Sequence, residues 1–160
     1  MSGETKKLVH AFTDGSCLGN PGRGGWAAIL TFGSSEKELS GGYARTTNNR
    51  MEIMGALFAL EALTEPCTVI LFTDSRYLCD AVGKKWLASW LKNGWKTAAK
   101  KPVKNRDLWE RLLPLLSHHT VSFRWLEGHA GHPQNERADT VARAAASQPD
   151  LPPDSGFEED

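Results

Sequence analysis

Long apolar runs are missing from this 160-residue sequence, and no stretch approaches the length needed to cross a membrane. We therefore exclude a membrane-spanning protein. The first residues, MSGETKK, are followed by no apolar segment long enough for a signal peptide. Cysteine is also scarce, and Cys17, Cys67 and Cys79 match neither a disulfide framework nor a zinc motif. We expect a reduced, cytoplasmic protein.

Net charge is absent as well, since 19 basic residues balance 19 acidic ones, but the charges are unevenly distributed. The segment from Lys84 to Arg106 carries eight basic residues and no acidic one. The segment from Ser147 to Asp160 carries five acidic residues and no basic one, and it is rich in proline. We expect one folded domain over residues 1–146 and a disordered acidic tail over residues 147–160.

Five β-prone segments bounded by turn residues predict the strands of one sheet. They are Leu8–Thr13, Trp26–Phe32, Lys37–Ala44, Thr68–Thr73 and Val121–Leu126. Gly-containing connections at residues 20–25 and 32–36 predict hairpins, so the first three strands should run antiparallel. Helices are expected over residues 47–63, 76–82, 85–91, 106–116 and 135–146. The fold class is therefore α/β, with a mixed five-stranded sheet flanked by helices.

The segment Phe-Thr-Asp occurs at the ends of both the first and the fourth predicted strands, so that Asp14 and Asp74 each follow a strand directly. Both are turn residues, or both serve one site. The helix between them carries one apolar stripe, made by Ile53, Ala56, Leu57, Leu60 and Leu63. A strand–helix–strand unit implies parallel strands, whose carboxyl ends meet at one sheet edge, so Asp14 and Asp74 should converge there. Two unscreened carboxylates this close repel unless a divalent cation lies between them. The pair predicts a metal site.

Two further acids and one histidine are candidates for the same edge, and each has an ordinary alternative. Glu52 lies in the first turn of the central helix, where Asn49-Arg50-Met51-Glu52 also fits a capping box. Asp139 lies early in the last helix, where an acid also suits the helix dipole. His129 lies in a Gly-flanked loop, where lone histidines are usually only solvated. Spacing alone leaves these alternatives open.

Five segments resemble, in the same order, those of the bacterial type-I ribonuclease H family: FTDGSCLGNPGRGGWAA, TTNNRMEIMGALFAL, FTDSRY, GWKTAAKKPVKNRDLW and GHAGHPQNERAD. The resemblance extends from about Leu8 to Ala146. It implies that Asp14, Glu52, Asp74 and Asp139 bind metal and that His129 is an auxiliary catalytic histidine. It also implies a mixed five-stranded sheet whose first three strands are antiparallel.

The resemblance implies an endonuclease that hydrolyses the RNA strand of RNA–DNA hybrids and leaves 5′-phosphate and 3′-hydroxyl ends. This endonuclease would use two Mg²⁺ ions as cofactors, and Mn²⁺ could replace them, because such hard cations prefer oxygen ligands. One ion, held by Asp14 and Asp139, would activate the attacking water. The other, held by Asp14, Glu52 and Asp74, would stabilise the leaving 3′-oxygen.

The resemblance further implies contacts with both strands of the hybrid. The minor groove would be contacted by Asn20, Asn48 and Asn49. A phosphate of the DNA strand would be held by Arg45, Thr47 and Asn105. Asn and Thr at such positions are also common turn and cap residues.

The basic segment resembles the protrusion with which the family binds phosphates. Its candidate contacts are Trp86, Trp90, Lys96, Lys100 and Lys101. The alternative is an ordinary amphipathic surface helix with its tryptophans packed inward. Eight positive charges without an acid favour phosphate binding.

Arg76 departs from the family pattern, because close bacterial relatives commonly carry glutamine there. Arginine would pair with phosphate or offset the acidic cluster. Related folds also serve DNA-cutting transposases, integrases and junction resolvases, and a non-catalytic hybrid-binding module is another class. The protrusion and the TTNN segment favour the hybrid, and the presence of all four acids favours an enzyme. We expect a monomer.

Overall fold

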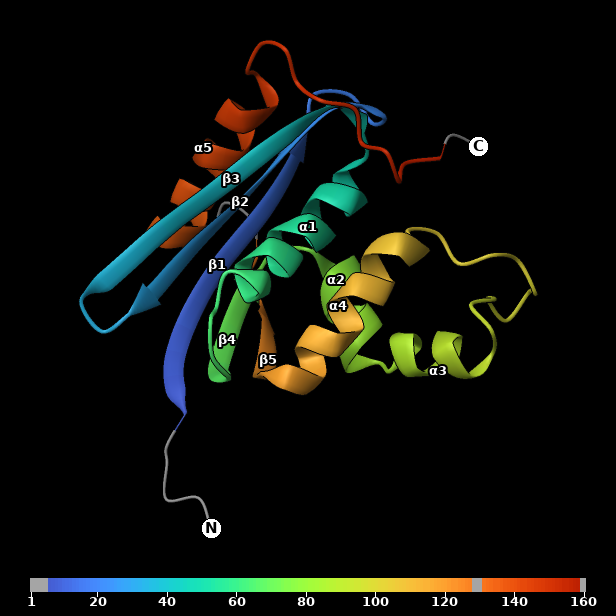
Figure 1. Ribbon diagram of the computed structural model, residues 1–160. Coiled ribbons are helices and arrows are strands. Elements are labelled where there is room, and N and C mark those ends of the chain that lie inside the picture. Colours follow the sequence, from blue (N-terminus) through green and yellow to red (C-terminus); the bar gives the residue numbers. More distant parts are fainter. Residues whose placement is uncertain (1–5, 128–130, 159–160) are drawn as a thin grey trace.

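The computed structural model describes residues 6–127 and 131–158, which form a five-stranded sheet with helices on both faces (Figure 1). The strands are β1 (Lys7–Cys17), β2 (Gly22–Phe32), β3 (Ser35–Thr46), β4 (Cys67–Thr73) and β5 (Thr120–Trp125). The helices are α1 (Asn48–Glu61), α2 (Arg76–Gly83), α3 (Trp86–Lys92), α4 (Arg106–His118) and α5 (Pro133–Ala146). Every predicted strand and helix is present. Among the described residues, no helix has the length and apolar character needed to span a membrane.

The strands are ordered β3-β2-β1-β4-β5 across the sheet. β1, β2 and β3 are antiparallel neighbours, whereas β1, β4 and β5 run parallel, so the predicted mixed sheet is confirmed. The parallel register pairs Phe12 of β1 with Phe72 of β4, and their rings stack with centroids 4.8 Å apart. The two Phe-Thr-Asp segments are therefore aligned residue for residue.

β1 is longer than the sequence predicts, because it continues past Asp14 to Cys17. Its parallel pairing with β4 stops at Phe12, but its antiparallel pairing with β2 continues to Cys17. The expectation that Asp14 follows the end of its strand is therefore wrong. Asp14 lies inside β1, two residues beyond the last pair with β4, which still places it at the edge where β4 ends.

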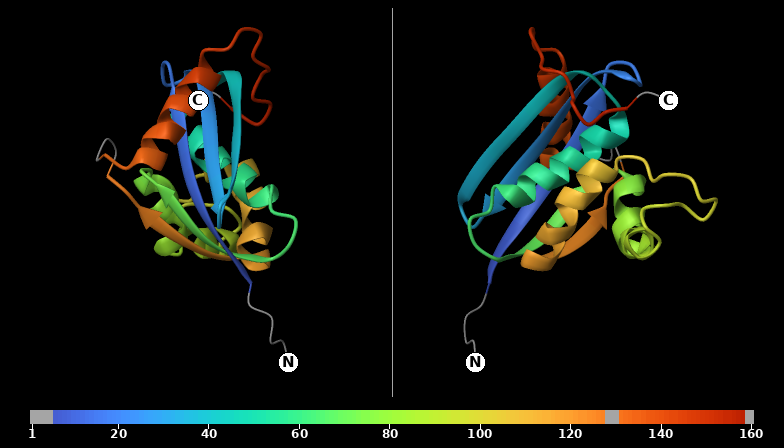
Figure 2. Two further views of the ribbon diagram at one scale, coloured as in Figure 1. Left: turned by 90° about the vertical axis from the view of Figure 1, so that its left-hand side faces the viewer. Right: turned by 45° about the vertical axis from the view of Figure 1, so that its right-hand side comes forward.

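The two faces of the sheet are covered by different helices, as Figure 2 shows. α1 packs on β1 and β2 and is itself covered by α4, while α5 packs on β1, β2 and β3. Side chains alternate along β2, so Ala28 and Leu30 join the main core. Ala27 and Ile29 point the other way and pack against α5.

α1 is buried on nearly all sides, which differs from the single apolar stripe that the sequence predicts. Residues outside that stripe, including Met51, Met54 and Ala59, are also buried, because α1 lies between the sheet and α4. Leu63, the last residue of the predicted stripe, lies beyond the helix, whose C-cap is Ala62. Burial fixes α1 firmly over the sheet edge where the acids converge.

The C-terminal segment runs back over the body of the chain, with Leu151, Asp154, Gly156 and Phe157 partly buried, which differs from the expected disordered tail (Figure 1). The Ala44 N–H donates to the Pro152 carbonyl over 2.8 Å and attaches this segment beside β3. The Asp154 side chain is 4% exposed and pairs with Arg50 of α1. The composition of this segment favours disorder, but composition carries no information about a single buried ion pair formed with a distant residue. The domain boundary at residue 146 stays a prediction.

Candidate active site

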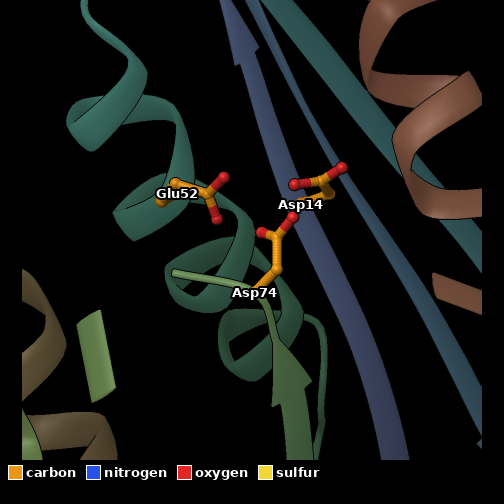
Figure 3. A group of neighbouring side chains, drawn as sticks. All are labelled: Asp14, Glu52 and Asp74. Carbon is orange, nitrogen blue, oxygen red and sulfur yellow. The ribbon is translucent and has the colours of Figure 1, made fainter. Parts of the chain in front are cut away.

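Asp14 and Asp74 meet where β1 and β4 separate, as their strand positions predict (Figure 3). One ligand oxygen from each of these residues and one from Glu52 all lie within 4.8 Å of one another. Asp14 and Glu52 are each 3% exposed, and Asp74 is half-buried. The three acids, here called the acidic triad, come from β1, from α1 and from the turn between β4 and α2.

Glu52 points into the triad and does not cap its helix. The N-cap of α1 is Thr47, whose side-chain oxygen accepts a hydrogen bond from the Arg50 N–H. The capping-box alternative, with Asn49 as the cap, is therefore wrong. α1 begins at Asn48, earlier than that pattern requires, so Glu52 lies one full turn inside the helix and its carboxylate is available for the site.

Gly15 holds the two buried carboxylates together. Its N–H lies 2.9 Å from Asp14 Oδ1 and 3.1 Å from Glu52 Oε1. A side chain at this position would place its Cβ 2.5 Å from the Glu52 nitrogen, closer than β1 and α1 allow. The Thr73 hydroxyl donates to the second Glu52 oxygen over 3.4 Å. Glycine at position 15 therefore permits the close approach that puts Glu52 over the strand ends.

Burial and mutual repulsion raise the pKa values of the buried acids. The pKa of Asp14 rises to about 8, because burial disfavours the charged form and because Asp74 adds negative charge nearby. Burial and the charges of Asp14 and Asp74 also raise the pKa of Glu52 well above its usual value. The triad therefore retains protons at neutral pH unless a cation replaces them.

Asp139 of α5 lines the same pocket as the triad but is not one of its three closest members. It lies beyond the first turn of α5, so the helix-dipole alternative explains little, and it pairs with Arg143 at 3.2 Å. Asp139 also contributes to the raised pKa of Asp14. His129 lies outside the described residues, so its role stays a prediction.

The side-chain oxygens of the triad suit a divalent cation that prefers oxygen ligands. All three are carboxylates, the ligand type that suits Mg²⁺ and Mn²⁺. Opposite ligands of one Mg²⁺ ion lie about 4.2 Å apart. Oxygens within 4.8 Å of one another therefore need only small side-chain rotations to share an ion.

Comparisons with known proteins identify the family. The RNase H family model matches residues 6–147. A ribonuclease H of Nitratidesulfovibrio vulgaris is 70% identical over 149 residues, which cover 93% of this chain and 96% of that protein. A ribonuclease H of Escherichia coli O9:H4 is 59% identical over 152 residues, covering 95% and 97%. The chain belongs to the ribonuclease H family.

A solved structure supports the same assignment at the level of the fold. The crystal structure of a type 1 RNase H with the type 2 active-site motif has a TM-score of 0.81 to this chain at 32% identity. The match covers 91% of this chain and 74% of that one. The resemblance found in the sequence is confirmed, and the whole acidic triad lies inside the range that the ribonuclease H family model matches.

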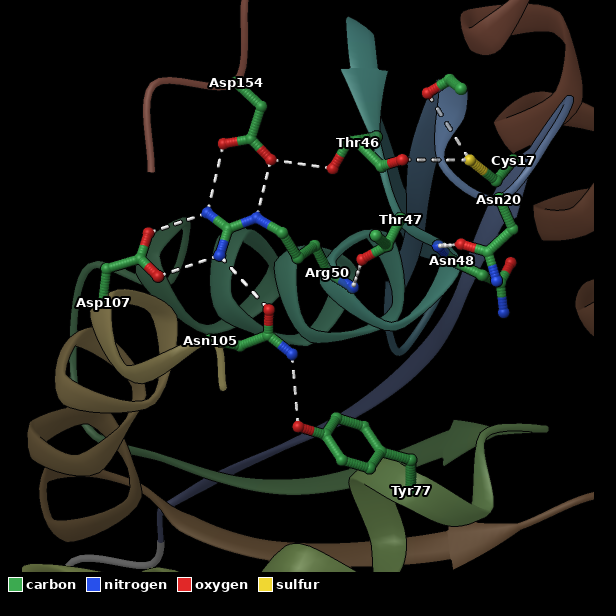
Figure 4. Close-up of polar contacts among 11 residues, drawn as sticks. Cys17, Asn20, Thr46, Thr47, Asn48, Arg50, Tyr77, Asn105, Asp107 and Asp154 are labelled. Carbon is green, nitrogen blue, oxygen red and sulfur yellow. Dashed lines mark hydrogen bonds and ion pairs between the residues drawn. The ribbon is translucent and has the colours of Figure 1, made fainter. Parts of the chain in front are cut away.

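Several of the candidate substrate-binding residues lie beside the triad. Asn48, Asn49 and Arg76 line the same pocket. Asn20 lies next to Asn48, whose N–H donates to the Asn20 side-chain oxygen over 3.2 Å (Figure 4). Arg45 is exposed near the end of β3. Their contacts with nucleic acid stay predictions.

Arg76 stacks on Trp125, a residue that sequence reasoning missed. The guanidinium carbon lies 4.0 Å from the ring centroid. The indole N–H of Trp125 donates to the Asp74 carbonyl over 3.1 Å, which joins the stacked pair to the backbone of a triad residue. Nothing in the sequence distinguishes Trp125 from an ordinary strand residue, because its partners lie about fifty positions away.

The basic segment from Lys84 to Arg106 forms α3 and a projecting loop, here called the basic protrusion (Figure 1). Trp86 and Trp90 pack toward the body, since Trp90 lies 6.1 Å from Trp86 and 6.0 Å from Trp109 of α4 between ring centroids. The loop lysines are exposed: Lys96, Lys100 and Lys101. The tryptophans thus anchor the protrusion, and the lysines remain accessible on it.

Proposed function

We propose that this protein hydrolyses the RNA strand of RNA–DNA hybrids and leaves 5′-phosphate and 3′-hydroxyl ends. The observation that carries the proposal is the convergence of Asp14, Glu52 and Asp74 at one sheet edge. Phosphodiester hydrolysis requires positive charge at the reacting phosphate, and clustered carboxylates provide it through bound cations. Family membership supports the substrate class, because the relatives at 70% and 59% identity are ribonucleases H.

The cation is proposed to be Mg²⁺, with Mn²⁺ as a substitute, and two ions are proposed to act with substrate. The triad would hold one, and Asp14 with Asp139 would hold the other, since Asp139 lines the same pocket. Bound there, such ions acidify a water molecule and stabilise a leaving oxygen. The protein's own part is orientation, because the Gly15 N–H and the Thr73 hydroxyl hold the carboxylates in place.

The hybrid is proposed to lie across the triad and the basic protrusion. Two sets of side chains would contact it: Asn20, Asn48 and Asn49 in the minor groove, and Arg45, Thr47 and Asn105 at a DNA phosphate. The position of Asn48 and Asn49 in the pocket supports the first set. The exposed lysines of the basic protrusion support a second phosphate-binding surface, whereas its inward-packed tryptophans fit either interpretation.

His129 is proposed to be an auxiliary acid–base group. Because it cannot replace a metal-binding carboxylate, His129→Ala should lower kcat by about 10- to 100-fold with little change in KM. Steady-state kinetics on a hybrid substrate measures both constants. A completely inactive variant would contradict an auxiliary role.

The protein is further proposed to act as a cytoplasmic monomer. All three members of the acidic triad come from one chain, so the site needs no second copy. Analytical ultracentrifugation of the active protein tests the oligomeric state. Sedimentation as a dimer at assay concentrations would contradict the proposal.

One assay tests the proposed reaction. The same labelled strand is incubated as RNA–DNA, RNA–RNA or DNA–DNA duplex, with Mg²⁺ or with EDTA. We expect cleavage of the RNA in the hybrid alone, with Mg²⁺ alone, and a 5′-phosphate that phosphatase removes from the product. Cleavage of the DNA duplex instead would favour a DNA-cutting relative, and tight hybrid binding without cleavage would favour a binding module.

A further inference from the structure

The buried Arg50 is the centre of a group of charged side chains, here called the Arg50 cluster, formed with the exposed Asp107 and the buried side chain of Asp154 (Figure 4). The Arg50 side chain is 2% exposed and that of Asp154 is 4% exposed. The guanidinium donates two hydrogen bonds to Asp154, two to Asp107 and one to Asn105, over 2.7–3.4 Å. A guanidinium has five N–H donors, so all of them are used. Arg50 therefore holds other residues and has no donor left for a ligand.

The Arg50 cluster connects two residues that are proposed to bind a DNA phosphate. On one side, the hydroxyl of Thr46 donates to Asp154 over 2.7 Å, and Thr46 is followed directly by Thr47. On the other side, Asn105 accepts from Arg50 through its side-chain oxygen. Asp154 thus holds Thr46, the residue before Thr47, by a direct hydrogen bond, and it reaches Asn105 only through Arg50.

These contacts determine which groups a phosphate would meet. Because Arg50 occupies the side-chain oxygen of Asn105, the amide must present its NH₂ group elsewhere, and one hydrogen bond of that group goes to the Tyr77 hydroxyl over 3.2 Å. Thr47 accepts the Arg50 backbone N–H with its side-chain oxygen, so its hydroxyl hydrogen remains available. Phosphate oxygens only accept hydrogen bonds, so both orientations suit a phosphate.

The C-terminal segment is shaped to fit the Arg50 cluster. At Gly156 it passes so close that a Cβ atom would collide with the Asp107 carboxylate and with Arg50 Nη2. Pro152 is tied to Ala44 of β3, and the Phe157 N–H closes a turn on the Asp154 carbonyl over 3.1 Å. Asp154 is therefore held on both sides of its position in the sequence.

We propose that residues 151–157 form a positioning element for substrate, in which Asp154, through its contacts with Thr46 and Arg50, orients Thr47 and Asn105 toward a phosphate of the DNA strand. This inference rests on the proposed function. Simple electrostatics predicts the opposite effect, because an acidic segment repels nucleic acid and loss of its charge should tighten binding. Loss of the Asp154 charge should therefore raise KM for the hybrid if Asp154 positions substrate, and lower KM if Asp154 only repels nucleic acid.

The test compares two variants that lose the same charge from the same segment. Asp154→Asn weakens the hold on Arg50 and Thr46, whereas Asp150→Asn changes an exposed residue that has no part in the Arg50 cluster. We expect Asp154→Asn to raise KM for the hybrid about 5- to 10-fold with kcat unchanged. Asp150→Asn should leave KM unchanged or slightly lower. A fall in KM for both variants would overturn the inference in favour of electrostatic repulsion.

A second measurement separates positioning from a general loss of stability. Single phosphates of the DNA strand are replaced, one position at a time, by uncharged methylphosphonates. For the wild type, KM should rise when the methylphosphonate replaces the phosphate that Thr47 and Asn105 bind. For Asp154→Asn, the difference in KM between this substituted hybrid and the unmodified hybrid should be much smaller. If Asp154→Asn keeps the full difference, the Arg50 cluster serves stability alone and the inference fails. Failure of the wild type to cleave any hybrid would instead reject the proposed function.

Gly156→Ala provides a variant that disturbs the same contact without changing charge. Its Cβ would displace the Asp107 carboxylate and shift the segment away from Arg50. It should reproduce the higher KM and the loss of the methylphosphonate difference. Urea unfolding confirms that each variant is folded under the assay conditions. A folded Gly156→Ala protein with wild-type KM and a wild-type methylphosphonate difference would also overturn the inference.

Discussion

α1 carries two buried charged residues only two positions apart, Arg50 and Glu52, and their surroundings are opposite in kind. Glu52 faces two further carboxylates, and burial together with their charges raises its pKa. Arg50 faces two carboxylates of the opposite sign and donates all its N–H groups to neighbours. Burial alone would lower the pKa of Arg50, but its hydrogen bonds to Asp107 and Asp154 outweigh burial and raise it.

The signs of the charges in the two groups show which group needs a bound ion. The Arg50 cluster contains both signs of charge and is complete within the chain, so removing one partner leaves a buried charge without compensation. The acidic triad contains one sign only, and it becomes a favourable arrangement when a cation binds. A structural group and a binding group thus differ in charge balance even though each contains a buried residue of α1.

The largest expected effect comes from breaking the triad. Asp14→Asn keeps nearly the same side-chain shape but removes the carboxylate that both proposed ions would share. Cleavage of the hybrid should fall by at least about a thousandfold, because several kcal/mol of transition-state stabilisation would be lost. Single-turnover kinetics with excess enzyme measures the loss. Activity within about tenfold of wild type would contradict the central role of Asp14.

The second effect comes from breaking the Arg50 cluster and appears in stability. Arg50→Leu leaves the Asp154 carboxylate, which is 4% exposed, without its cation. The free energy of unfolding should fall by about 3–5 kcal/mol, as for other buried pairs that lose one partner. Urea unfolding measures the change. The double variant Arg50→Leu/Asp154→Leu should recover part of the loss, since it removes the uncompensated charge, and no recovery would argue that burial of Asp154 is not the cause.

The two charged groups also differ in how far the sequence predicts them. The triad follows from the repeated Phe-Thr-Asp segments, because parallel strands in register bring equivalent residues to one edge. Asp14 and Asp74 could therefore be paired from the repeated segments and the strand–helix–strand pattern between them. Glu52 required more, since its spacing also fits a capping box, and only the position of Thr47 as the N-cap removes that alternative.

The Arg50 cluster was missed because its members lie far apart in the sequence and each has a local explanation. Asp107 looks like an acid in the first turn of a helix, and Asp154 lies in a proline-rich acidic stretch that indicates disorder. Asp154 is 104 residues from Arg50, so no periodic pattern connects them. Nothing next to Arg50 in the sequence marks it as buried, because it stands between Asn49 and Met51 in the first turn of α1, where a charged residue is ordinarily solvated.

The basic protrusion is a third charged region, and its charges are exposed to water. Its lysines share one sign, as the triad does, but they are exposed and so carry no burial cost. Replacing Lys96, Lys100 and Lys101 with Ala should raise KM about tenfold, leave kcat unchanged and flatten the dependence of binding on salt. Stability should hardly change. An unchanged salt slope would favour the ordinary surface-helix interpretation.

The smallest expected effect is on the stability of the metal-free protein. Asp14→Asn removes one of three like charges and should stabilise the protein by about 0.5–1 kcal/mol at the upper end of its pH range. The folded pKa of about 8 lies above the ordinary value of 3.8, so the folded wild type holds an extra proton between these values and loses stability as pH rises across that window. The advantage of the variant should therefore be absent below about pH 4 and largest above about pH 8.

Urea unfolding in EDTA across this pH range measures the advantage of Asp14→Asn, and the same series with Mg²⁺ provides the control. The ion binds the folded wild type and stabilises it by mass action, so the advantage should shrink or reverse. Arg50→Leu leaves all three acids of the triad in place. Mg²⁺ should therefore raise its free energy of unfolding by the same amount as that of wild type. If Asp14→Asn gains nothing over wild type at about pH 8 without metal, the like charges of the triad do not oppose folding, and the contrast with the Arg50 cluster is one of function alone.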